Sequence, residues 1–579
     1  MADTGRVWQS VPYIIRSALL VLRDARNLLW IERIRKNLRP PTPEIYPILH
    51  PDTERGNTSM SHSEIDDLKQ EIVSLRSELQ RARQQSDSSY YFSAEAKQDL
   101  TRETHLPDTG LPAKTVKTII ENAHALDFDQ KLNTSSYVNV SFEPEEEEVA
   151  LMGLSVNLAD QTVYPKSYAM HDSVVNMIAD MWHCPRPDDF EEYGVYPGAG
   201  TVGSTEACLL AGLALKFRWR AWYKKRHGLS DDVVRAMRPN VVISTCYQAA
   251  WEKLFKYLDI EPRLVQPSSH TFKIDPDGVR ESIDEKTMAV VCIMGNHYGG
   301  QYDPVWDVDK VIGELNEAND WQVGIHVDAA SGGFIAPFQK DLPDWDFRLP
   351  NVLSISSSGH KYGESCCGTG WVVWREREDL SEHVAISVTY LGGKADSYTL
   401  NFSRPASGVY VQFYKLLRFG LAGYRQSEEN MMQNADFLRT ELSAMRYEDK
   451  PRFVLLDDGN KHCLPVVTAM LNPDAGFTYD DIDLQHVLSQ HHWYVSGYKM
   501  NYQHPITEET LSLFHDKKTD QTMFRIVVKG NLTRTMAKDL MESFCAALEF
   551  LDAVDFSSLH GVTTKKMRHK DQRVVTNHC

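Results

Sequence analysis

The sequence has no long uninterrupted apolar segment. It contains no stretch of about 18 uncharged apolar residues, the length that crosses a bilayer as a helix. The nearest candidate, Val11 to Leu22, is interrupted by Arg16, and no small-residue cleavage site follows a short apolar core. We therefore expect neither a membrane span nor a secretory signal.

Cysteine is sparse, with nine residues at irregular spacing in a chain of 579. No CxxC pair indicates a zinc site, and no dense framework indicates disulfides. Reduced thiols are typical of a cytosol-like compartment. The sequence therefore predicts a cytoplasmic protein without a metal site.

Positive charge is in deficit. The chain has 62 Lys and Arg against 80 Asp and Glu, a net charge of −18. This balance argues against nucleic acid as the main partner, because phosphate backbones need a basic surface. It does not exclude a small anion, which one local arginine can hold.

Composition and pattern divide the chain into four parts. We expect an N-terminal extension over residues 1–111, a large domain over 112–430, a smaller α/β domain over 431–556 and a basic tail over 557–579. Helical patterns alternate with short β-rich runs, which is typical of βαβ units and a largely parallel sheet. The runs are Val241–Ser244, Met288–Ile293, Val323–Val327, Val352–Ser356 and Gly370–Trp374. The predicted fold class is therefore α/β.

The extension itself contains three segments. Residues 11–38 are basic, with apolar residues at helical spacing; they form a helix that docks on a partner subunit, lies on a membrane surface or acts as an organelle presequence. Residues 40–62 read as a linker. Residues 65–82 carry a short heptad pattern, either a coiled coil between subunits or a packed or frayed helix.

An acidic run lies near the start of the large domain. Glu145–Glu148 is expected to be a solvated helix start.

An aspartate and a lysine stand at the ends of two predicted strands. Asp328 ends the run Val323–Val327, and Lys361 ends the segment SSSGHK after Val352–Ser356. Ligands bind outside the carboxyl ends of such strands, and a buried carboxylate needs a partner. Alternatively, Asp328 caps a helix and Lys361 is a surface lysine. Enzymes that use pyridoxal phosphate (PLP) need this pair, because the lysine forms a Schiff base and the acid keeps the ring nitrogen protonated.

Longer segments extend the pattern: VGSTEACLLAGLALKFRWR, HVDAASGGFIAPF, DWDFRLPNVLSISSSGHKYG and YLGGKADSYTLNFSRPA. On these segments the chain resembles the glutamate decarboxylases, a branch of the group II PLP-dependent decarboxylases with the aspartate-aminotransferase-like fold type I. The resemblance covers about residues 130 to 550 and not the first 110. It implies a large domain with a mostly parallel sheet, a smaller α/β domain, PLP as cofactor and a homodimer or higher homo-oligomer.

The resemblance also implies the cofactor residues. Lys361 would carry the cofactor, and Asp328 would pair with the ring nitrogen. Ala330 and Gln248 would pack on opposite faces of the ring. His360, beside the lysine, would belong to the catalytic group. The residues implied for the phosphate are Ser204, Thr205, Ser358, His360 and, from a neighbouring subunit, Ser403.

The substrate residues come from the same resemblance. Arg525 matches the arginine that binds the α-carboxylate, a contact for which its forked guanidinium is suited; from the sequence alone it reads as a strand-end surface arginine. The residues matched to the distal carboxylate, partly across the subunit boundary, are Ser136, Tyr137, Asn157 and Asp160. Ser136 stands where a threonine is usual.

Three departures from the family pattern lie near these residues. His297 replaces a threonine and either contacts the cofactor or fills the space left by Gly299 and Gly300. Glu252 replaces a histidine, and GESCCGTGW follows the lysine where the family has apolar residues and proline. These changes leave the predicted cofactor site intact, but they do not decide which acidic amino acid is the substrate.

The expected reaction is the α-decarboxylation of glutamate to 4-aminobutyrate. Aspartate, giving β-alanine, is the alternative substrate, because one methylene is a small difference for a site to enforce. Another fold type I reaction, such as transamination, is disfavoured by GSTEA and NFSRPA. An inactive PLP-binding scaffold is the alternative of another class, and the presence of Lys361, Asp328 and Arg525 argues against it.

Two roles stay open. The Cα proton donor is Tyr390, Tyr398 or Lys361. The tail ends in His578-Cys579. It is disordered, or it supplies a histidine that plugs the site at neutral pH, as the resemblance to bacterial members of the family implies, or it binds calmodulin as plant members do, although it lacks the aromatic anchors.

Overall fold

The computed structural model describes residues 70–77, 104–107, 109–267, 271–380, 386–388, 395–457, 459, 462–514 and 521–554. It divides the chain into two compact units, residues 1–119 and 120–579. In the first unit, residues 70–77 of the predicted heptad segment are helical. The predictions for residues 11–38, 40–62 and 557–579 lie outside the described residues, as does Tyr390.

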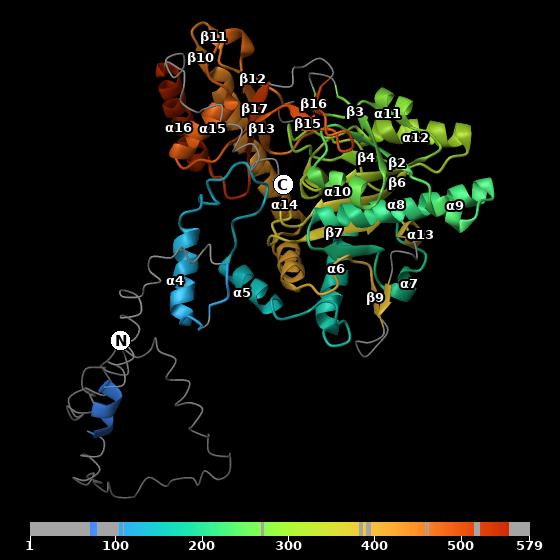
Figure 1. Ribbon diagram of the computed structural model, residues 1–579, viewed down its shortest axis with the longest axis horizontal. Helices are drawn as coiled ribbons and strands as arrows, with labels where there is room; N and C mark the ends of the chain where they lie inside the picture. The colour runs from blue at the N-terminus through green and yellow to red at the C-terminus, as the bar shows by residue number, and fades with distance from the viewer. Residues whose placement is uncertain are drawn as a thin grey trace, which may run out of the picture. The chain divides into compact units, whose positions relative to one another are not determined.

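A seven-stranded sheet lies at the centre of the second unit (Figure 1). β7 runs antiparallel to both of its neighbours, and the other pairs in this sheet are parallel. All five β-rich runs predicted from the sequence are strands of this sheet. Its spatial order is β1 (Gly198–Thr201), β7 (Gly370–Trp374), β6 (Val352–Ser358), β5 (Gly324–Asp328), β4 (Thr287–Ile293), β2 (Asn240–Ser244) and β3 (Glu261–Val265).

Both faces of this sheet are covered by helices. Along β2, Val241 and Ile243 pack with α8 (Ser204–His227) and α10 (Ala249–Tyr257), whereas Val242 belongs to the core on the other face. That other core includes side chains of α6 (Pro165–Met181) and α12 (Val305–Asn319). Alternate strand residues point to opposite faces, so a sheet covered on both sides requires the continuous apolar strands seen in the sequence.

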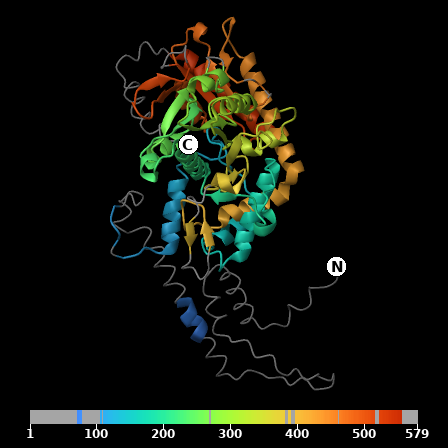
Figure 2. The same cartoon turned by 90° about the vertical axis from the view of Figure 1, so that its right-hand side faces the viewer.

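A second, four-stranded antiparallel sheet follows the long helix α14 (Ser407–Ala444), which is broken at Gly420. The orange and red segments of this region gather together in both views (Figures 1 and 2). The strand order is β12 (Phe453–Leu455), β13 (Val466–Leu471), β17 (Thr522–Val527) and β14 (Ser496–Lys499). The accompanying helices are α15 (Asp481–Gln490) and α16 (Arg534–Ala553).

One hydrophobic core joins the two sheets. Val327 of β5, Leu438 of α14 and Phe524 of β17 belong to the same cluster of buried side chains. The predicted division between residues 430 and 431 remains a prediction, and it falls inside α14. The shared core fixes the second sheet against the first and thereby brings β17 to the edge where the predicted cofactor residues lie.

The acidic run differs from its prediction in one residue. A helix does begin there, α5 (Pro144–Gly153), and Glu145, Glu147 and Glu148 are exposed. Glu146, however, is fully buried, so the prediction of a solvated run is wrong for this residue. Its carboxylate lies 3.0 Å from the ammonium of Lys415 on α14, and this ion pair makes its burial tolerable.

Shorter elements complete the described chain. Among the residues that the structure describes, no helix is both long and apolar enough to cross a membrane, and no cluster of His, Cys, Asp and Glu could hold a metal ion. The remaining elements are α4 (Ala113–His124), α7 (Phe190–Tyr193), α9 (Asp231–Arg235), α11 (Pro276–Ser282), η5 (Gly332–Phe334), η6 (Ala336–Phe338), α13 (Arg377–Leu380), β8 (Ile386–Val388), β9 (Ala395–Ser397), β10 (Arg446–Tyr447), β11 (Lys450–Pro451), η7 (Pro473–Ala475), β15 (Asn501–Gln503) and β16 (Thr510–Ser512).

Candidate active site

A buried carboxylate ends the central strand β5. Asp328 is 4% exposed; its Oδ2 accepts a hydrogen bond of 2.7 Å from the indole Nε1 of Trp251, and its Oδ1 accepts one of 3.1 Å from the backbone N of Ala330. Both donors are neutral, so they orient the carboxylate without neutralising it. A carboxylate offers about four lone-pair sites, so Asp328 retains capacity for a cationic partner.

The predicted cofactor lysine reaches the turn that follows Asp328. β5 and β6 are parallel neighbours, so their carboxyl ends lie at the same edge of the sheet. Lys361 follows β6, and its Nζ donates a hydrogen bond of 3.2 Å to Oγ of Ser331. The same Nζ lies 5.3 Å from the ring centroid of Tyr137. The fold therefore brings the acid and the lysine to one place, as the sequence pattern predicts.

The start of α8 lies beside His360. Gly203 precedes the helix with φ of 137°, and a Cβ built there would lie 3.6 Å from Cε1 of His360. Ser204 and Thr205 are the first helical residues, and the first N–H groups of a helix have no intrahelical acceptor. Backbone donors and the helix dipole at such a position suit a phosphate.

Two further groups at this edge have unused hydrogen-bonding capacity. Ser358 Oγ and His297 Nδ1 are buried and have no hydrogen-bond partner among the described residues. Buried polar atoms of this kind are rare in folded proteins and are usually satisfied by a ligand or water. With the helix start, the carboxylate and the lysine, they fit a polar cofactor that carries a phosphate.

Both histidines of the site are neutral at neutral pH. Burial, assisted by the charge of Lys361, lowers the pKa of His360 to about 4, and its Nδ1 lies 2.7 Å from the carbonyl O of Thr369. Burial, followed by the charges of Arg525 and Lys361, holds the pKa of His297 well below its ordinary value of 6.5. Neutral imidazoles can accept a hydrogen bond through one nitrogen and donate through the other.

Gln248 and Ala330 lie on the segments that flank Asp328. Gln248 is the N-cap residue of α10, three positions before Trp251, and Ala330 is 6% exposed in the turn after β5. Glu252, the residue that departs from the family histidine, lies on the partly exposed side of α10 and pairs with Lys256 at 2.8 Å.

Arg525 is buried on β17 and not on the surface. It is 6% exposed, and its guanidinium donates hydrogen bonds to the backbone O of His297 and, at 2.8 Å, to the backbone O of Ser135. Its Cζ lies 5.0 Å from the ring centroid of Tyr137, whose hydroxyl donates to the same carbonyl of His297 at 3.4 Å. Arg525, Tyr137, His297 and Lys361 thus form one contact group.

Asn157 and Asp160, two of the other predicted substrate residues, form a separate group with Ser403. Asn157 Nδ2 donates to Asp160 Oδ2 at 3.2 Å and to Ser403 Oγ at 3.4 Å. Within the described residues, no hydrogen bond links these three side chains to Tyr137 or Arg525. Ser136 makes a local turn, accepting a hydrogen bond of 3.2 Å from the backbone N of Val138.

The sequence did not identify three residues that hold the site together. Trp251, Ser331 and Thr369 bond directly to Asp328, Lys361 and His360, respectively. Of the three, only Trp251 carries a signal in the sequence, because the N–H of a buried indole requires a hydrogen-bond acceptor. Tyr398, one of the predicted proton donors, packs against the cluster of buried side chains that includes Leu210 and Val372.

Known proteins resemble this chain over most of its length. Residues 114–463 match the pyridoxal-dependent decarboxylase conserved domain. A glutamate decarboxylase of Lactococcus lactis subsp. lactis is 34% identical over 80% of this chain and 92% of its own length. Glutamate decarboxylase 1 of Arabidopsis thaliana is 33% identical over 81% of this chain and 88% of its own.

A solved structure agrees with these sequence matches. The glutamate decarboxylase of Lactobacillus brevis CGMCC 1306 superimposes with a TM-score of 0.70 at 34% identity, covering 80% of this chain and 98% of the other. The expected α/β fold of the PLP-dependent decarboxylases is therefore confirmed. The chain belongs to the pyridoxal-dependent decarboxylase family and is an amino acid decarboxylase that uses pyridoxal phosphate.

Proposed function

We propose that the protein removes the α-carboxylate of L-glutamate and releases carbon dioxide and 4-aminobutyrate. The observation that carries this proposal is the arrangement of the buried Asp328 and Arg525 with the half-buried Lys361 at one edge of the fold. The matched relatives are named glutamate decarboxylases, which favours glutamate. None of these relatives supports aspartate as the substrate. The presence of Asp328, Lys361 and Arg525 disfavours an inactive PLP-binding scaffold.

Each residue around the cofactor has a physical task in this proposal. Lys361 would hold the cofactor through its ε-amine, and Asp328 would stabilise a positive charge on the ring nitrogen. Gln248 and Ala330 would pack on the ring. The groups proposed to hold the phosphate are Ser204, Thr205, Ser358, His360 and a partner subunit's serine equivalent to Ser403. When bound, the cofactor supplies a ring that accepts the electrons of the broken carbon–carbon bond.

The remaining residues would hold the substrate. Arg525 would bind the α-carboxylate, and its attachment to two backbone carbonyls fixes the direction of the guanidinium. His297, half-buried and neutral, would offer its buried Nδ1 toward the cofactor. The distal carboxylate would lie near Ser136 and Tyr137 of one subunit and Asn157 and Asp160 of the other. A site closed in this way excludes water during the reaction.

We propose that the site is completed by a second copy of the chain. α5 and α14 pack together, with Ser407 Oγ donating to the backbone O of Ala150 at 2.8 Å. Both helices, and the C-cap residue of α5, nevertheless leave large apolar side chains exposed, and a second subunit would cover them. These side chains are Leu151, Met152, Leu154, Leu417 and Leu421.

We propose a cytoplasmic location for the protein. Its eight described cysteines are all free thiols, six of them buried or partly buried, which suits a reducing compartment.

Side-by-side measurement of carbon dioxide release tests the substrate. Glutamate should give the highest kcat/KM among glutamate, aspartate, cysteine sulfinate and aromatic amino acids, with aspartate lower by about 10- to 200-fold because it is one methylene shorter. Equal or faster release from aspartate would overturn the choice of glutamate. No release from any of them would favour the scaffold.

Replacing the buried arginine tests the carboxylate contact. Arg525→Met should lower kcat/KM for glutamate by a factor of about 100 or more, since it removes one partner of a desolvated charge pair. The absorbance band of the bound cofactor should persist. Arg446→Met, at an exposed arginine in the same C-terminal region, is the matched control. Loss of the cofactor from Arg525→Met would instead mean that Arg525 has a structural role.

Mixed dimers test the contribution of Ser403 across the interface. Lys361→Ala should lack the cofactor band and activity, and Ser403→Ala should bind the cofactor weakly. A dimer with one subunit of each kind, isolated through two affinity tags, keeps both native residues in one of its sites and should recover about half of wild-type activity. Mixed dimers no more active than the two parents, or a stable monomer with full cofactor occupancy, would refute the shared site.

A further inference from the structure

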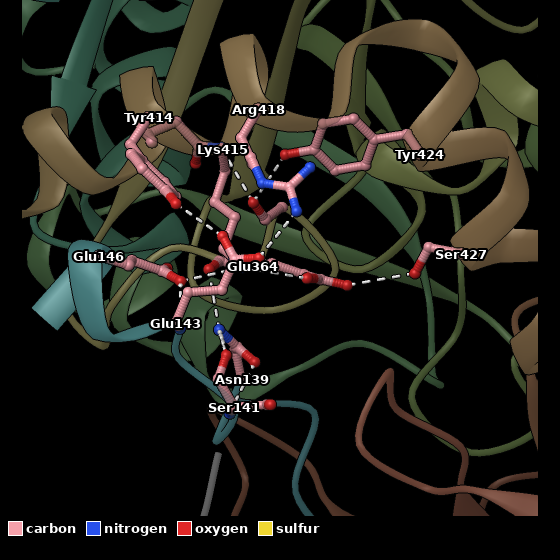
Figure 3. Close-up of polar contacts among 12 residues, drawn as sticks. Asn139, Ser141, Glu143, Glu146, Glu364, Tyr414, Lys415, Arg418, Tyr424 and Ser427 are labelled. Atoms are coloured by element: carbon pink, nitrogen blue, oxygen red, sulfur yellow. Dashed lines mark hydrogen bonds and ion pairs between the residues drawn. The ribbon is translucent and has the colours of Figure 1, made fainter. Parts of the chain in front are cut away.

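A buried ionic cluster joins Lys415 to Glu146 and Glu364 (Figure 3), and Glu364 lies three residues after Lys361. The ammonium of Lys415 on α14 lies 3.0 Å from Oε2 of Glu146 on α5 and 3.6 Å from Oε2 of Glu364. The side chains of Lys415, Glu146 and Glu364 are 3%, 0% and 14% exposed, respectively. Glu364 belongs to the GESCC segment, which departs from the family pattern, and Glu146 is the buried member of the acidic run.

Further polar groups surround this cluster from the same elements. On the α5 side, Glu143 accepts a hydrogen bond of 2.6 Å from the hydroxyl of Tyr414 and pairs with Arg418 at 3.1 Å. On the other side, Ser427 donates to Glu364 at 3.3 Å, and Tyr424 lies nearby (Figure 3). Three carboxylates therefore face two cations, and the two most deeply buried carboxylates share a single ammonium.

The cluster is tied to the cofactor lysine through the backbone. The N–H of Glu364 donates to the carbonyl of Lys361 at 3.1 Å, and Glu364 has φ of 59°, a region that side-chain-bearing residues rarely adopt. Asn139 binds both ends of the segment 360–364. Its backbone N–H donates a hydrogen bond to the carbonyl O of His360, and its Nδ2 donates one to the carbonyl O of Glu364, each at 2.8 Å. A strained conformation of this kind persists only when its surroundings hold it.

α14 adds two more contacts to this segment. Gln412 Nε2 and the hydroxyl of Tyr424 each donate a hydrogen bond of 3.0 Å to the carbonyl O of Gly363. Together with Lys415 and Ser427, which both contact Glu364, α14 thus holds residues 363 and 364 at four points. Lys361 stands two residues before Gly363, and its Nζ donates a hydrogen bond of 3.2 Å to Oγ of Ser331.

We propose that Lys415 is a positioning residue for the decarboxylation: with Glu146 and Glu364 it fixes the backbone of residues 360–364 and thereby holds Lys361 in place. This inference rests on the proposed role of Lys361. Lys415 touches neither substrate nor cofactor in this scheme and acts through the backbone of the segment.

The excess carboxylate makes the positioning depend on pH. Burial raises the pKa of Glu146 and of Glu364 above the ordinary value of 4.5, and Lys415 only partly offsets this effect. Glu146 Oε1, buried without a hydrogen-bond partner among the described residues, is a place for the extra proton. The held segment therefore binds a proton more tightly than the released one. It should be held most firmly in acid and loosen as the pH rises through the raised pKa values.

Hydrogen–deuterium exchange on the full-length protein, with and without its cofactor, tests the inference. Protection factors of the peptide covering residues 359–366 are measured between pH 5 and pH 8 for wild type and for Lys415→Met, Glu146→Gln and Glu364→Gln. Glu147→Gln is the matched control, because Glu147 is the exposed neighbour of Glu146. In wild type the opening constant should rise by up to about tenfold per pH unit, the slope for one released proton.

The variants should separate as follows. Glu146→Gln and Glu364→Gln each leave one carboxylate with one ammonium, so their opening constants should be nearly independent of pH, whereas Glu147→Gln should follow wild type. Lys415→Met leaves two carboxylates without a cation, so at pH 7 its segment should open at least tenfold more and release the cofactor faster.

Three results would overturn the inference: wild-type protection in Lys415→Met, an unchanged slope in both glutamine variants, or a Glu147→Gln variant that behaves like Glu146→Gln. If Lys415→Met does not fold, the two glutamine variants decide the question. Wild-type protein that takes up no pyridoxal phosphate would instead contradict the proposed function, and the exchange data on the cofactor-free protein would still test the cluster.

Discussion

A carboxylate held inside the protein is the constraint on which the site depends. Asp328 ends β5 in the middle of the sheet, where desolvation of a charge is costly unless it is well partnered. Trp251 and the backbone of Ala330 fix its direction without cancelling its charge. The fold therefore maintains a buried negative charge that a cationic ring nitrogen would satisfy, and Lys361, the helix start at Ser204 and Arg525 are arranged around it.

The supporting structure is as specific as the site itself. One hydrophobic core connects β5, α14 and β17, so Arg525 on the second sheet lies at the edge where β5 and β6 end. α14 also holds the segment after Lys361 through Gln412, Lys415 and Tyr424. Preorganisation of this kind places reacting groups before the substrate arrives and lowers the cost of orienting it.

Local patterns in the sequence predicted the fold and the centre of the site, but not the contacts between distant segments. Strand ends carrying Asp328 and Lys361 are visible in the sequence because parallel strands share an edge, and the family motifs extended that prediction. The roles of Trp251, Ser331 and Thr369 cannot be predicted from local sequence, because they depend on which side chains meet after folding. The burial of Glu146 is unpredictable from local sequence for the same reason, because its partner, Lys415, is far away in the sequence.

The buried charge of Asp328 is tested most directly by nitrogen-15 NMR of the protein loaded with pyridoxal phosphate labelled at the ring nitrogen. We expect the nitrogen to be protonated at neutral pH in wild type and unprotonated in Asp328→Asn, because the amide carries no charge to stabilise the proton. An unprotonated nitrogen in wild type, or a proton retained in Asp328→Asn, would contradict the role given to this carboxylate.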